Sequence, residues 1–542
     1  MNKRIMNIIL LMTLVLVSCS SSASSRYGGN DFMTIQTITT HSLVIPILKR
    51  NETNKVIRLE IVTKGKNKPL TLEQVWGKMS GNISELADLA LYNETNDISV
   101  LVGTATNLSK KIRLNSEYIL AEGNNTFWLS VKLTDTADID GKLSINLSSV
   151  TVNGEKFSIQ QETQSKPFSF GIALRKQNDD NVNTYRIPGL TTTNKGTLIA
   201  VYDVRYNNSK DLQEDIDIGM SRSTDGGQTW EPMQIIMDMG EWGGRPQKLN
   251  GIGDPCVLYD NETGTLWVAG LWMSGANEKD ALWRASNPGM KPEETGQFIL
   301  VKSPDDGLTW SAPINITEQI KDPAWQLLLQ GPGRGICMKD GTLVFPAQFK
   351  ANIAEKSLDG GEFTCHSTIV YSKDHGKSWH IGTGAKSNTT EAQVVELADG
   401  SLMLNMRDDR NKIDKGETNG RAVSVTSDFG KNWTVHPSSN TALPEPNCMA
   451  SIISANVKVG KENKEVLFFS NPDNKNSRSN MTIKASLDGG LTWPAEYQLE
   501  IYETKGFGYS CMTMIDEQTI GILYEGTKEL YFQRILVSDI LD

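Results

Sequence analysis

The stretch Ser223-Thr-Asp-Gly-Gly-Gln-Thr-Trp230 decides the fold, because its pattern returns four more times along the chain. The other copies are SPDDGLTW at 303–310, SKDHGKSW at 372–379, TSDFGKNW at 426–433 and SLDGGLTW at 486–493. The Asp can accept hydrogen bonds from its own turn, a Gly permits positive φ, and the Trp buries a large apolar face. A repeat of roughly 50 to 80 residues is typical of the blades of a β-propeller. Five copies within residues 166–542 predict a propeller of six blades, one of which has lost its copy.

Residues 26–165 contain no such copy, and their apolar residues alternate in short runs. Examples are VIRLEIV at 56–62, ISVLV at 98–102 and TFWLSVKL at 126–133. Alternation with a period of two, with turn signals such as Asn153-Gly154, predicts a small antiparallel β-sandwich. This sandwich is expected either to bind carbohydrate or to buttress the propeller, and the sequence supports both interpretations. The whole chain is therefore predicted to be all-β.

Residues 1–19 have the pattern of an export signal. Lys3 and Arg4 precede an apolar stretch, residues 5–17, that is too short to span a bilayer. The stretch ends in Leu-Val-Ser-Cys19, which resembles a bacterial lipobox, and a Ser-rich segment follows. We expect an exported protein in the periplasm or at the cell surface, with a lipid anchor at Cys19. An ordinary cleaved signal is the alternative.

Composition argues against several classes of function. A net charge of −10 does not suit a nucleic-acid partner, which would select a basic surface. The five histidines show no metal-ligand spacing, which argues against a histidine metal centre and a Ser-His-Asp triad. The cysteines after Cys19 fit no zinc or redox motif and are expected to be mostly buried small residues. We expect no metal or organic cofactor.

Charged residues between the repeats indicate the function. The stretch Thr184-Tyr-Arg-Ile-Pro-Gly189 contains the Arg-Ile-Pro signature of sialidases, and the repeated pattern is their Asp box, or BNR repeat. Residues 170–542 therefore resemble a bacterial exo-sialidase (neuraminidase). The resemblance implies that the chain removes terminal sialic acid from sialylated glycans on glycoproteins, glycolipids or oligosaccharides.

The resemblance implies three arginines that hold the carboxylate of sialic acid. Arg186, Arg407 and Arg478 match these positions, and a guanidinium fork suits a carboxylate better than an ammonium does. Glu525 matches the acid that holds the first arginine in place. Arg205 matches the arginine that supports the floor of the site.

The resemblance also implies a tyrosine nucleophile. Tyr509 matches it, and Glu391 matches the partner that takes its proton. A charged nucleophile would approach the substrate carboxylate against its charge, whereas a phenol can be deprotonated as it attacks. Tyr524 competes for the role, but its place beside Glu525 suits a supporting one. Attack by tyrosine implies a covalent intermediate and retention of configuration.

Asp211 matches the acid/base of the family. A carboxylic acid on a loop can protonate the glycosidic oxygen and later activate water. Asp215 and Asp217 alternate on the next expected strand, so we expect structural roles for them. Asp254 matches an acid near the 4-hydroxyl of the sugar, although an Asp before Pro255 also suits a turn.

The wall of the pocket is harder to assign. Gln348 is a weaker candidate for it. Trp267, Trp272 and Trp283 are candidates for the apolar patch that receives the N-acetyl group, and the sequence does not choose among them. Two alternative functions stay open: a trans-sialidase or intramolecular transfer enzyme, and a non-catalytic Asp-box propeller that binds glycans. A nucleophile pair argues against the second, because a binding protein has no need of it.

Overall fold

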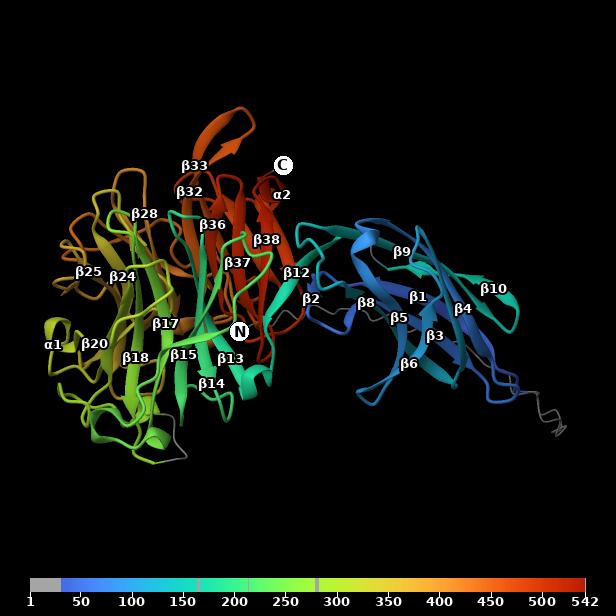
Figure 1. The fold of residues 1–542 in the computed structure, drawn as a ribbon, viewed down its shortest axis with the longest axis horizontal. Helices are drawn as coiled ribbons and strands as arrows, with labels where there is room; N and C mark the ends of the chain where they lie inside the picture. Colours follow the sequence, from blue (N-terminus) through green and yellow to red (C-terminus); the bar gives the residue numbers. More distant parts are fainter. Residues whose placement is uncertain (1–30, 163–165, 213, 278–281, 542) are drawn as a thin grey trace, which may run out of the picture.

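The structure, a computed structural model, describes residues 31–162, 166–212, 214–277 and 282–541. The export signal and Cys19 lie outside the described residues. Figure 1 shows a β-propeller beside an N-terminal β domain, which confirms the predicted all-β class with this order of parts. Helices are single turns such as α1 (Thr317–Ile320) and α2 (Ser538–Leu541). Within the described ranges, no helix is long and apolar enough to cross a membrane.

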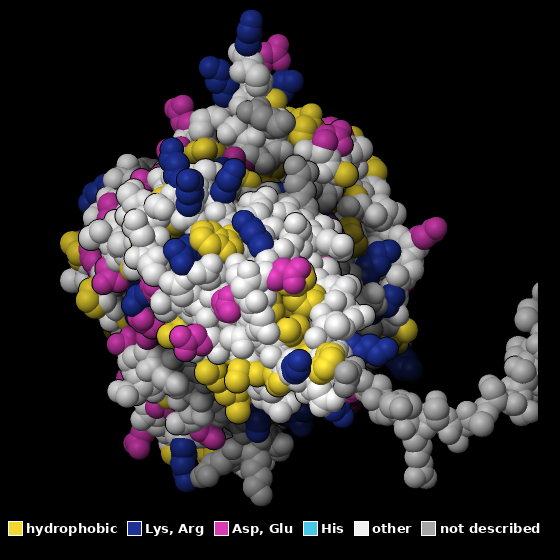
Figure 2. All heavy atoms as spheres, turned by 90° about the vertical axis from the view of Figure 1, so that its right-hand side faces the viewer, with side chains coloured by type: hydrophobic (Ala, Val, Ile, Leu, Met, Phe, Trp, Pro, Cys, Tyr) yellow, Lys and Arg dark blue, Asp and Glu magenta, His cyan; other side chains and the backbone are white. Residues whose placement is uncertain are grey.

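The N-terminal β domain is a run of paired strands folded over one apolar core. In β8, Phe127, Leu129 and Val131 are fully buried while Trp128 faces the other way, as the period of two predicts. The core joins residues of β3 and β8 to residues of β4 and β9, so the two halves of the run pack face to face. Figure 2 shows the outer end of this domain. Nine strands pair in the order β11-β1-β3-β8-β5-β6-β7-β4-β9, while β10 pairs with β9 and β2 pairs with β12 (Phe168–Arg175). The strands are β1 (Thr34–Ser42), β2 (Ile47–Lys49), β3 (Asn54–Lys64), β4 (Thr71–Gly81), β5 (Leu86–Thr95), β6 (Ile98–Ala105), β7 (Lys111–Ile119), β8 (Gly123–Leu133), β9 (Lys142–Val152), β10 (Glu155–Ser158) and β11 (Gln160–Gln161).

The propeller contains five separate sheets. The first holds β13 (Thr184–Thr192), β14 (Leu198–Arg205), β15 (Ile216–Ser223) and β16 (Gln234–Met237); the second β17 (Asn250–Asp260), β18 (Thr265–Ser274), β19 (Gln297–Ser303), β20 (Ile314–Asn315) and β22 (Gly333–Arg334). The third holds β21 (Leu327–Gln330), β23 (Ile336–Cys337), β24 (Leu343–Ala351), β25 (Thr364–Ser372), β26 (His380–Ile381) and β27 (Lys386–Ser387). The fourth holds β28 (Thr389–Glu396), β29 (Leu402–Asp408), β30 (Ala422–Thr426) and β31 (Thr434–Val435); the fifth β32 (Ser451–Val459), β33 (Glu462–Pro472), β34 (Met481–Ser486) and β35 (Gln498–Tyr502).

Each of these five sheets carries one Asp box. The box lies in the turn between the two outermost strands, as between β15 and β16. There the backbone N–H of Thr229 donates to Asp225 Oδ1 (3.0 Å), the N–H of Gly227 donates to Ser223 Oγ (2.9 Å), and Trp230 Nε1 donates to Gly227 O (3.1 Å). The bonds to the Asp and to the Ser or Thr recur in the other four boxes. The repeat is therefore a self-satisfied turn that ends each sheet.

The prediction of six blades is wrong, because the propeller has five separate sheets. The remaining strands, β36 (Ser510–Asp516), β37 (Thr519–Glu525) and β38 (Leu530–Leu536), belong to a fifteen-stranded sheet that runs on into the N-terminal domain. Strand β12 (Phe168–Arg175) makes the connection: Ile172 pairs with Phe532 of β38, and Phe168 pairs with Leu143 of β9. Strand β36 packs against β13 and β32, so this shared sheet closes the ring. Sharing strands leaves no exposed edge at the closure.

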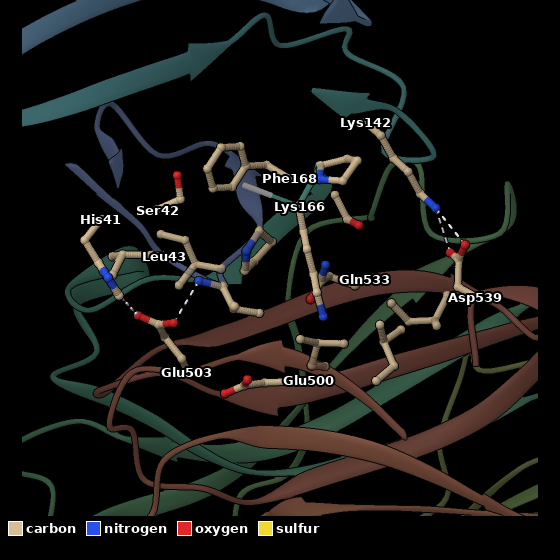
Figure 3. A pocket seen from close by; sticks show the side chains of 18 residues that line it. His41, Ser42, Leu43, Lys142, Lys166, Phe168, Glu500, Glu503, Gln533 and Asp539 are labelled. Atoms are coloured by element: carbon tan, nitrogen blue, oxygen red, sulfur yellow. Dashed lines mark hydrogen bonds and ion pairs between the residues drawn. The ribbon is translucent and has the colours of Figure 1, made fainter. Parts of the chain in front are cut away.

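Polar contacts fix the two parts of the chain around a cavity of about 420 Å³. Figure 3 shows this cavity, with Lys142 Nζ 2.8 Å from both oxygens of Asp539. The carboxylate of Glu503 accepts from the N–H of Val44 (3.0 Å), while the N–H of Glu503 donates to Val44 O (2.8 Å). The interface is therefore held by ion pairs and backbone bonds as well as by the shared sheet.

Candidate active site

The matched residues gather around a cavity of about 270 Å³ in the propeller. Asp211, Asp254, Glu391, Arg407 and Tyr509 all line it. They come from three sheets and one loop: Asp254 from β17, Glu391 and Arg407 from the neighbouring strands β28 and β29, Tyr509 from the residue before β36, and Asp211 from the loop after β14. Residues that are far apart in the sequence thus meet where the inner strands converge.

Tyr509 and Glu391 form a directly bonded pair. The Tyr509 hydroxyl donates to Glu391 Oε1, and Arg407 Nη1 contacts both Glu391 Oε2 (2.6 Å) and the Tyr509 oxygen (3.1 Å). Burial and the Glu391 charge raise the pKa of Tyr509 well above its ordinary value, despite the neighbouring arginines. The phenol is therefore neutral in the free protein, and Glu391 is placed to take its proton.

Glu525 organises one side of the cavity. Its carboxylate accepts from Arg186 Nε (3.0 Å) and Nη2 (3.3 Å), and also from the backbone N–H groups of Ile187 (2.9 Å) and Tyr509 (2.9 Å). One buried acid thus fixes both an arginine and the backbone of the tyrosine. Tyr524 faces the other way, because its hydroxyl donates to Gln533 Oε1 (2.8 Å) in a separate part of the core.

The three arginines converge on Tyr509. The guanidinium carbons of Arg186 and Arg478 lie 5.0 Å and 5.5 Å from the centre of its ring. Arg478 is held by backbone carbonyl groups, with Nη1 2.9 Å from Phe507 O and Nη2 3.3 Å from Asn447 O. The Asn447 side chain in turn accepts from Arg407 Nη2 (2.9 Å). Asn447 therefore orients two arginines, a role that no motif signals.

Asp211 occupies the space between two arginines. Its Oδ1 lies 3.0 Å from Arg186 Nη1 and 2.7 Å from Arg205 Nη1, and its side chain is 60% exposed. Burial raises the pKa of this carboxyl, but Arg205 and Arg186 outweigh it and lower the pKa to about 2. Asp217 accepts a hydrogen bond from Tyr206 (2.8 Å) outside the cavity, and burial raises its pKa to about 7.

A second acidic group lies beneath the cavity. Asp203 Oδ2 accepts from Arg205 Nε (3.0 Å) and Nη2 (2.7 Å), and Asp203 Oδ1 accepts from the backbone N–H of Asp254 (2.8 Å). Burial, followed by the charges of Asp203 and Asp211, raises the pKa of Asp254 well above its ordinary value. The raised pKa favours the protonated form of Asp254, which can donate a hydrogen bond into the cavity. Sequence inspection missed Asp203, since it sits inside an ordinary strand.

Irregular backbone aims several of these side chains. Ile187 has φ 58° and lies in a β-bulge after Arg186, and Asp254 has φ 57° in a second bulge. Asn447 also has positive φ, 62°. Positive φ is costly for such residues, above all for a β-branched one, and it clusters at functional sites. The bulge gives a structural reason for the Arg-Ile-Pro signature.

Leucines, and not tryptophans, form the apolar wall. The wall consists of Leu212, Leu271, Leu327 and Leu329. The prediction for Trp267 and Trp272 is wrong: Trp267 packs on Trp379 and Trp272 on Trp242, and neither lines the cavity. The side chain of Trp283 lies outside the described residues. Trp267 and Trp272 are both buried in the cores between neighbouring sheets. In the sequence, the four leucines cannot be told apart from ordinary core residues of strands.

The rest of the wall includes Gln348 and the charged residues Lys350, Asp359, Asp409 and Lys412. Gln348 lines the cavity and is 6% exposed. Of the five cysteines after Cys19, four are buried and Cys337 is half-buried, and none is paired in a disulfide. Among the side chains that the structure describes, no group of three or more His, Cys, Asp or Glu residues is placed to hold a metal ion.

Comparisons with known proteins agree with this geometry. Residues 196–522 match the family of the BNR repeat-like domain, and residues 93–156 match the N-terminal domain of BNR-repeat neuraminidase. The chain is 48% identical over 445 residues to a sialidase of Bacteroides fragilis, covering 82% of this chain and 79% of that one. It is 32% identical to a sialidase of Micromonospora viridifaciens over 63% of this chain and 50% of that one. The structure of the Hadza microbial sialidase Hz136 superposes with a TM-score of 0.85, at 42% identity, over 93% of this chain and all of that one.

The fold, the site and these relatives define a glycoside hydrolase, an exo-sialidase that hydrolyses sialic acid from its substrates. Within that class the chain belongs to the BNR-repeat neuraminidase family. The resemblance inferred from the Asp boxes and the Arg-Ile-Pro signature is therefore confirmed.

Proposed function

We propose that the chain is a retaining exo-α-sialidase that works through a covalent intermediate on Tyr509. The observation that carries this proposal is the hydrogen bond from the Tyr509 hydroxyl to Glu391. Arg407 donates hydrogen bonds to both of these side chains. A neutral phenol bonded to a carboxylate is a nucleophile with its base in place. Its substrates are terminal sialic acids on glycoproteins, glycolipids and oligosaccharides.

Binding begins at the arginines. The substrate carboxylate takes charge-assisted hydrogen bonds from Arg186, Arg407 and Arg478. Asp211 lies against Arg186 in the free protein, so the incoming carboxylate displaces it. The loss of this cation and the arrival of an anion both raise the pKa of Asp211 from about 2, which lets the carboxyl take up a proton. The substrate thus converts Asp211 into an acid as it binds.

Two displacements at the anomeric carbon follow. Tyr509 Oη bonds to that carbon as its proton passes to Glu391, the glycosidic C–O bond breaks, and Asp211 protonates the leaving oxygen. Water then attacks the same carbon, Asp211 takes its proton, the bond to Tyr509 breaks and Glu391 returns the proton to the phenolate. Two inversions give net retention.

The remaining walls suit the other substituents of sialic acid. The four leucines offer an apolar surface for the N-acetyl methyl group. Asp254 lines the cavity where we expect the 4-hydroxyl, and its raised pKa favours the protonated form that can donate to that group. Gln348 adds an amide to the wall. Each contact helps to fix the orientation of the sugar ring in the cavity.

The order of anomers tests the proposal. Rapid NMR of sialyllactose turnover should show the α-anomer of free sialic acid first, and a 3-fluoro sialosyl fluoride should label Tyr509. Tyr509→Phe should abolish the label and lower turnover by roughly 10² or more. Labelling of Tyr524, or β-anomer formed first, would contradict the mechanism. The same spectra separate hydrolysis from transfer, since a transfer enzyme yields a sialylated acceptor or an anhydro sugar.

We also propose that the protein is exported and carries a lipid at Cys19, in the periplasm or at the cell surface. Support comes from Lys3, Arg4, the short apolar stretch and the lipobox-like end of residues 1–19. Metabolic labelling with a fatty acid should mark the wild-type chain and spare Cys19→Ser. Labelling of both, or of neither, would contradict the anchor.

A further inference from the structure

A second cavity of the propeller, of about 290 Å³, lies farther along the inner strands than the catalytic residues. On β28, Glu391 lines the catalytic cavity, whereas residues 394–396 line the second one. On β17, Asp254 lines the catalytic cavity, whereas Val257 pairs with Arg334, which lines the second. Three to five residues along a strand span about 10–17 Å. The two cavities are therefore separate.

Arg334 brings a positive charge to the second cavity without a counter-charge. The side chain is half-buried, its Nε is buried, and within the described ranges it forms no ion pair and no hydrogen bond. Burial lowers the pKa of the guanidinium, and only the neighbouring thiols of Cys511 and Cys256 oppose this effect. Burial also raises the pKa of both thiols, which favours their neutral forms. A buried cation without an anionic partner is costly.

Arginines buried elsewhere in the propeller have the partner that Arg334 lacks. Arg205 Nη2 lies 2.7 Å from Asp203 Oδ2, and Arg421 Nη1 lies 2.8 Å from Glu445 Oε2. All four of these side chains are almost completely buried. Burial of an arginine in this fold is thus usually accompanied by a carboxylate, and Arg334 is an exception that faces a cavity.

The backbone holds Arg334 in place. The carbonyl group of Pro332 accepts from Gln393 Nε2 (2.9 Å), and the N–H of Gly335 donates to a carbonyl group of β17 (2.9 Å). Between them Gly333 has φ 105°, a conformation that residues with a Cβ rarely adopt. Arg334 is therefore presented to the cavity by a fixed turn and cannot swing freely toward a distant acid.

The rest of the cavity determines which kind of anion suits it. Its walls include the buried side chains of Val394 and Ile452. Two glutamates also line it: Glu396 accepts from the backbone N–H of Lys339 (2.9 Å), and Glu465 is exposed. Neither glutamate pairs with the guanidinium, but their charges repel a multiply charged anion. A guanidinium is weakly hydrated and offers one charge, so a small monovalent anion fits best.

We propose that the second cavity binds a small monovalent anion, a halide or a short carboxylate, on the guanidinium of Arg334. The anion supplies a counter-charge where the strands β17, β28 and β32 line the propeller interior. Because it binds the folded chain and not the unfolded one, it stabilises the propeller by mass action. The proposal is independent of the proposed function, since the two cavities share no lining residue.

Thermal unfolding of the full chain tests the site. Replacing gluconate by chloride or by acetate at constant ionic strength should raise the melting temperature of the wild type by about 1–2 °C and then saturate. The anion that saturates at the lower concentration is the preferred one. Arg334→Gln should show no such rise, whereas the matched control Arg113→Gln, at an exposed arginine of β7, should keep it in full. An equal rise in Arg334→Gln and the wild type would overturn the proposal.

Diffraction locates the anion without requiring any variant to fold. Wild-type crystals soaked in bromide should show an anomalous peak beside the Arg334 guanidinium, or crystals soaked in acetate should show a carboxylate there. Density for water alone at the guanidinium after both soaks would refute the site.

Turnover keeps this proposal apart from the proposed function. Arg334→Gln, assayed below its melting temperature, should hydrolyse an aryl sialoside as fast as the wild type does. Loss of that activity in a folded Arg334→Gln chain would show that the two cavities are not separate. An inactive wild type would contradict the proposed function alone.

Discussion

At the scale of the residue, Asp211 occupies two positions in turn, one in the free protein and another during turnover. In the free protein it neutralises Arg186 and Arg205, and in turnover it must leave Arg186 to the substrate. An acid that competes with the ligand for a cation weakens ligand binding. The same contact holds the Arg186 side chain in place until the substrate arrives. The ion pair therefore lowers the affinity for substrate but keeps Arg186 ordered in the free protein.

Asp211→Asn should therefore tighten the binding of an unsaturated sialic acid analogue while it impairs catalysis. Because the ion pair is partly exposed, we expect an affinity gain of about fivefold, or ~1 kcal/mol. Turnover of sialyllactose should fall much more than that of a nitrophenyl sialoside, whose leaving group needs no proton. Calorimetric titration gives the affinity. Asp399→Asn, which removes the same charge from a turn away from the cavity, is the control, and weaker binding by Asp211→Asn would contradict displacement.

At the scale of the element, the Asp box stabilises the folded state, and this stabilisation depends on pH. Asp305 accepts from Thr309 Oγ1 (2.5 Å), from the backbone N–H of Thr309 (2.9 Å) and from Ser303 Oγ (2.8 Å). These bonds, led by the one from the Thr309 hydroxyl, lower the pKa of Asp305 to about 2. A depressed pKa means that the ionised form stabilises the fold. The stabilisation is present above the ordinary pKa of Asp and disappears as pH falls toward 2.

Asp305→Ala should lower the melting temperature by about 1–3 °C at neutral pH. The difference from the wild type should shrink between about pH 4 and pH 2, because the wild-type carboxyl is then protonated as well. Asp516→Ala is the matched control, since its carboxylate accepts one backbone bond, from Gln518, in a turn without a box. A pH-independent difference would show that the box acts through packing alone.

Features that lie within one element could be predicted from the sequence, whereas contacts between strands could not. The boxes and the arginines stand in contiguous motifs, so their place in the fold and their likeness to a family were visible in the chain. Asn447 and Asp203 act through contacts with residues of other strands, and no local pattern marks them. The leucine wall was missed for the same reason. The blade count failed because β36, β37 and β38 pair through β12 with the N-terminal domain and so form no separate sheet.

At the scale of the whole molecule, the N-terminal domain and the propeller share a sheet. Phe170 of β12 is fully buried in the core of the N-terminal domain, while the neighbouring Ala173 pairs with Tyr531 of β38. One strand therefore belongs to both parts. The two parts should therefore unfold together.

Calorimetry of the full chain should show a single unfolding transition. Deleting residues 31–165 should expose Phe168 and Phe170 and leave an unpaired edge at β12, because their partners in β9 and β2 are gone. The truncated chain should be poorly soluble and melt at a lower temperature. Arg113→Gln, an exposed substitution on β7 that leaves the pairings of β12 intact, is the control and should melt as the wild type does. Two transitions, or a soluble truncated chain with full activity toward an aryl sialoside, would contradict the coupling.

The pairing of β12 with β38 also determines when the propeller ring can close during synthesis. The strand that completes the ring, β38, follows every other propeller strand in the chain, whereas its partner β12 precedes them all. During synthesis the five box-bearing sheets can form one after another, but the ring stays open until β38 has left the ribosome. Until then β12 presents a free edge, and the nascent protein must be kept from pairing that edge with a neighbouring chain.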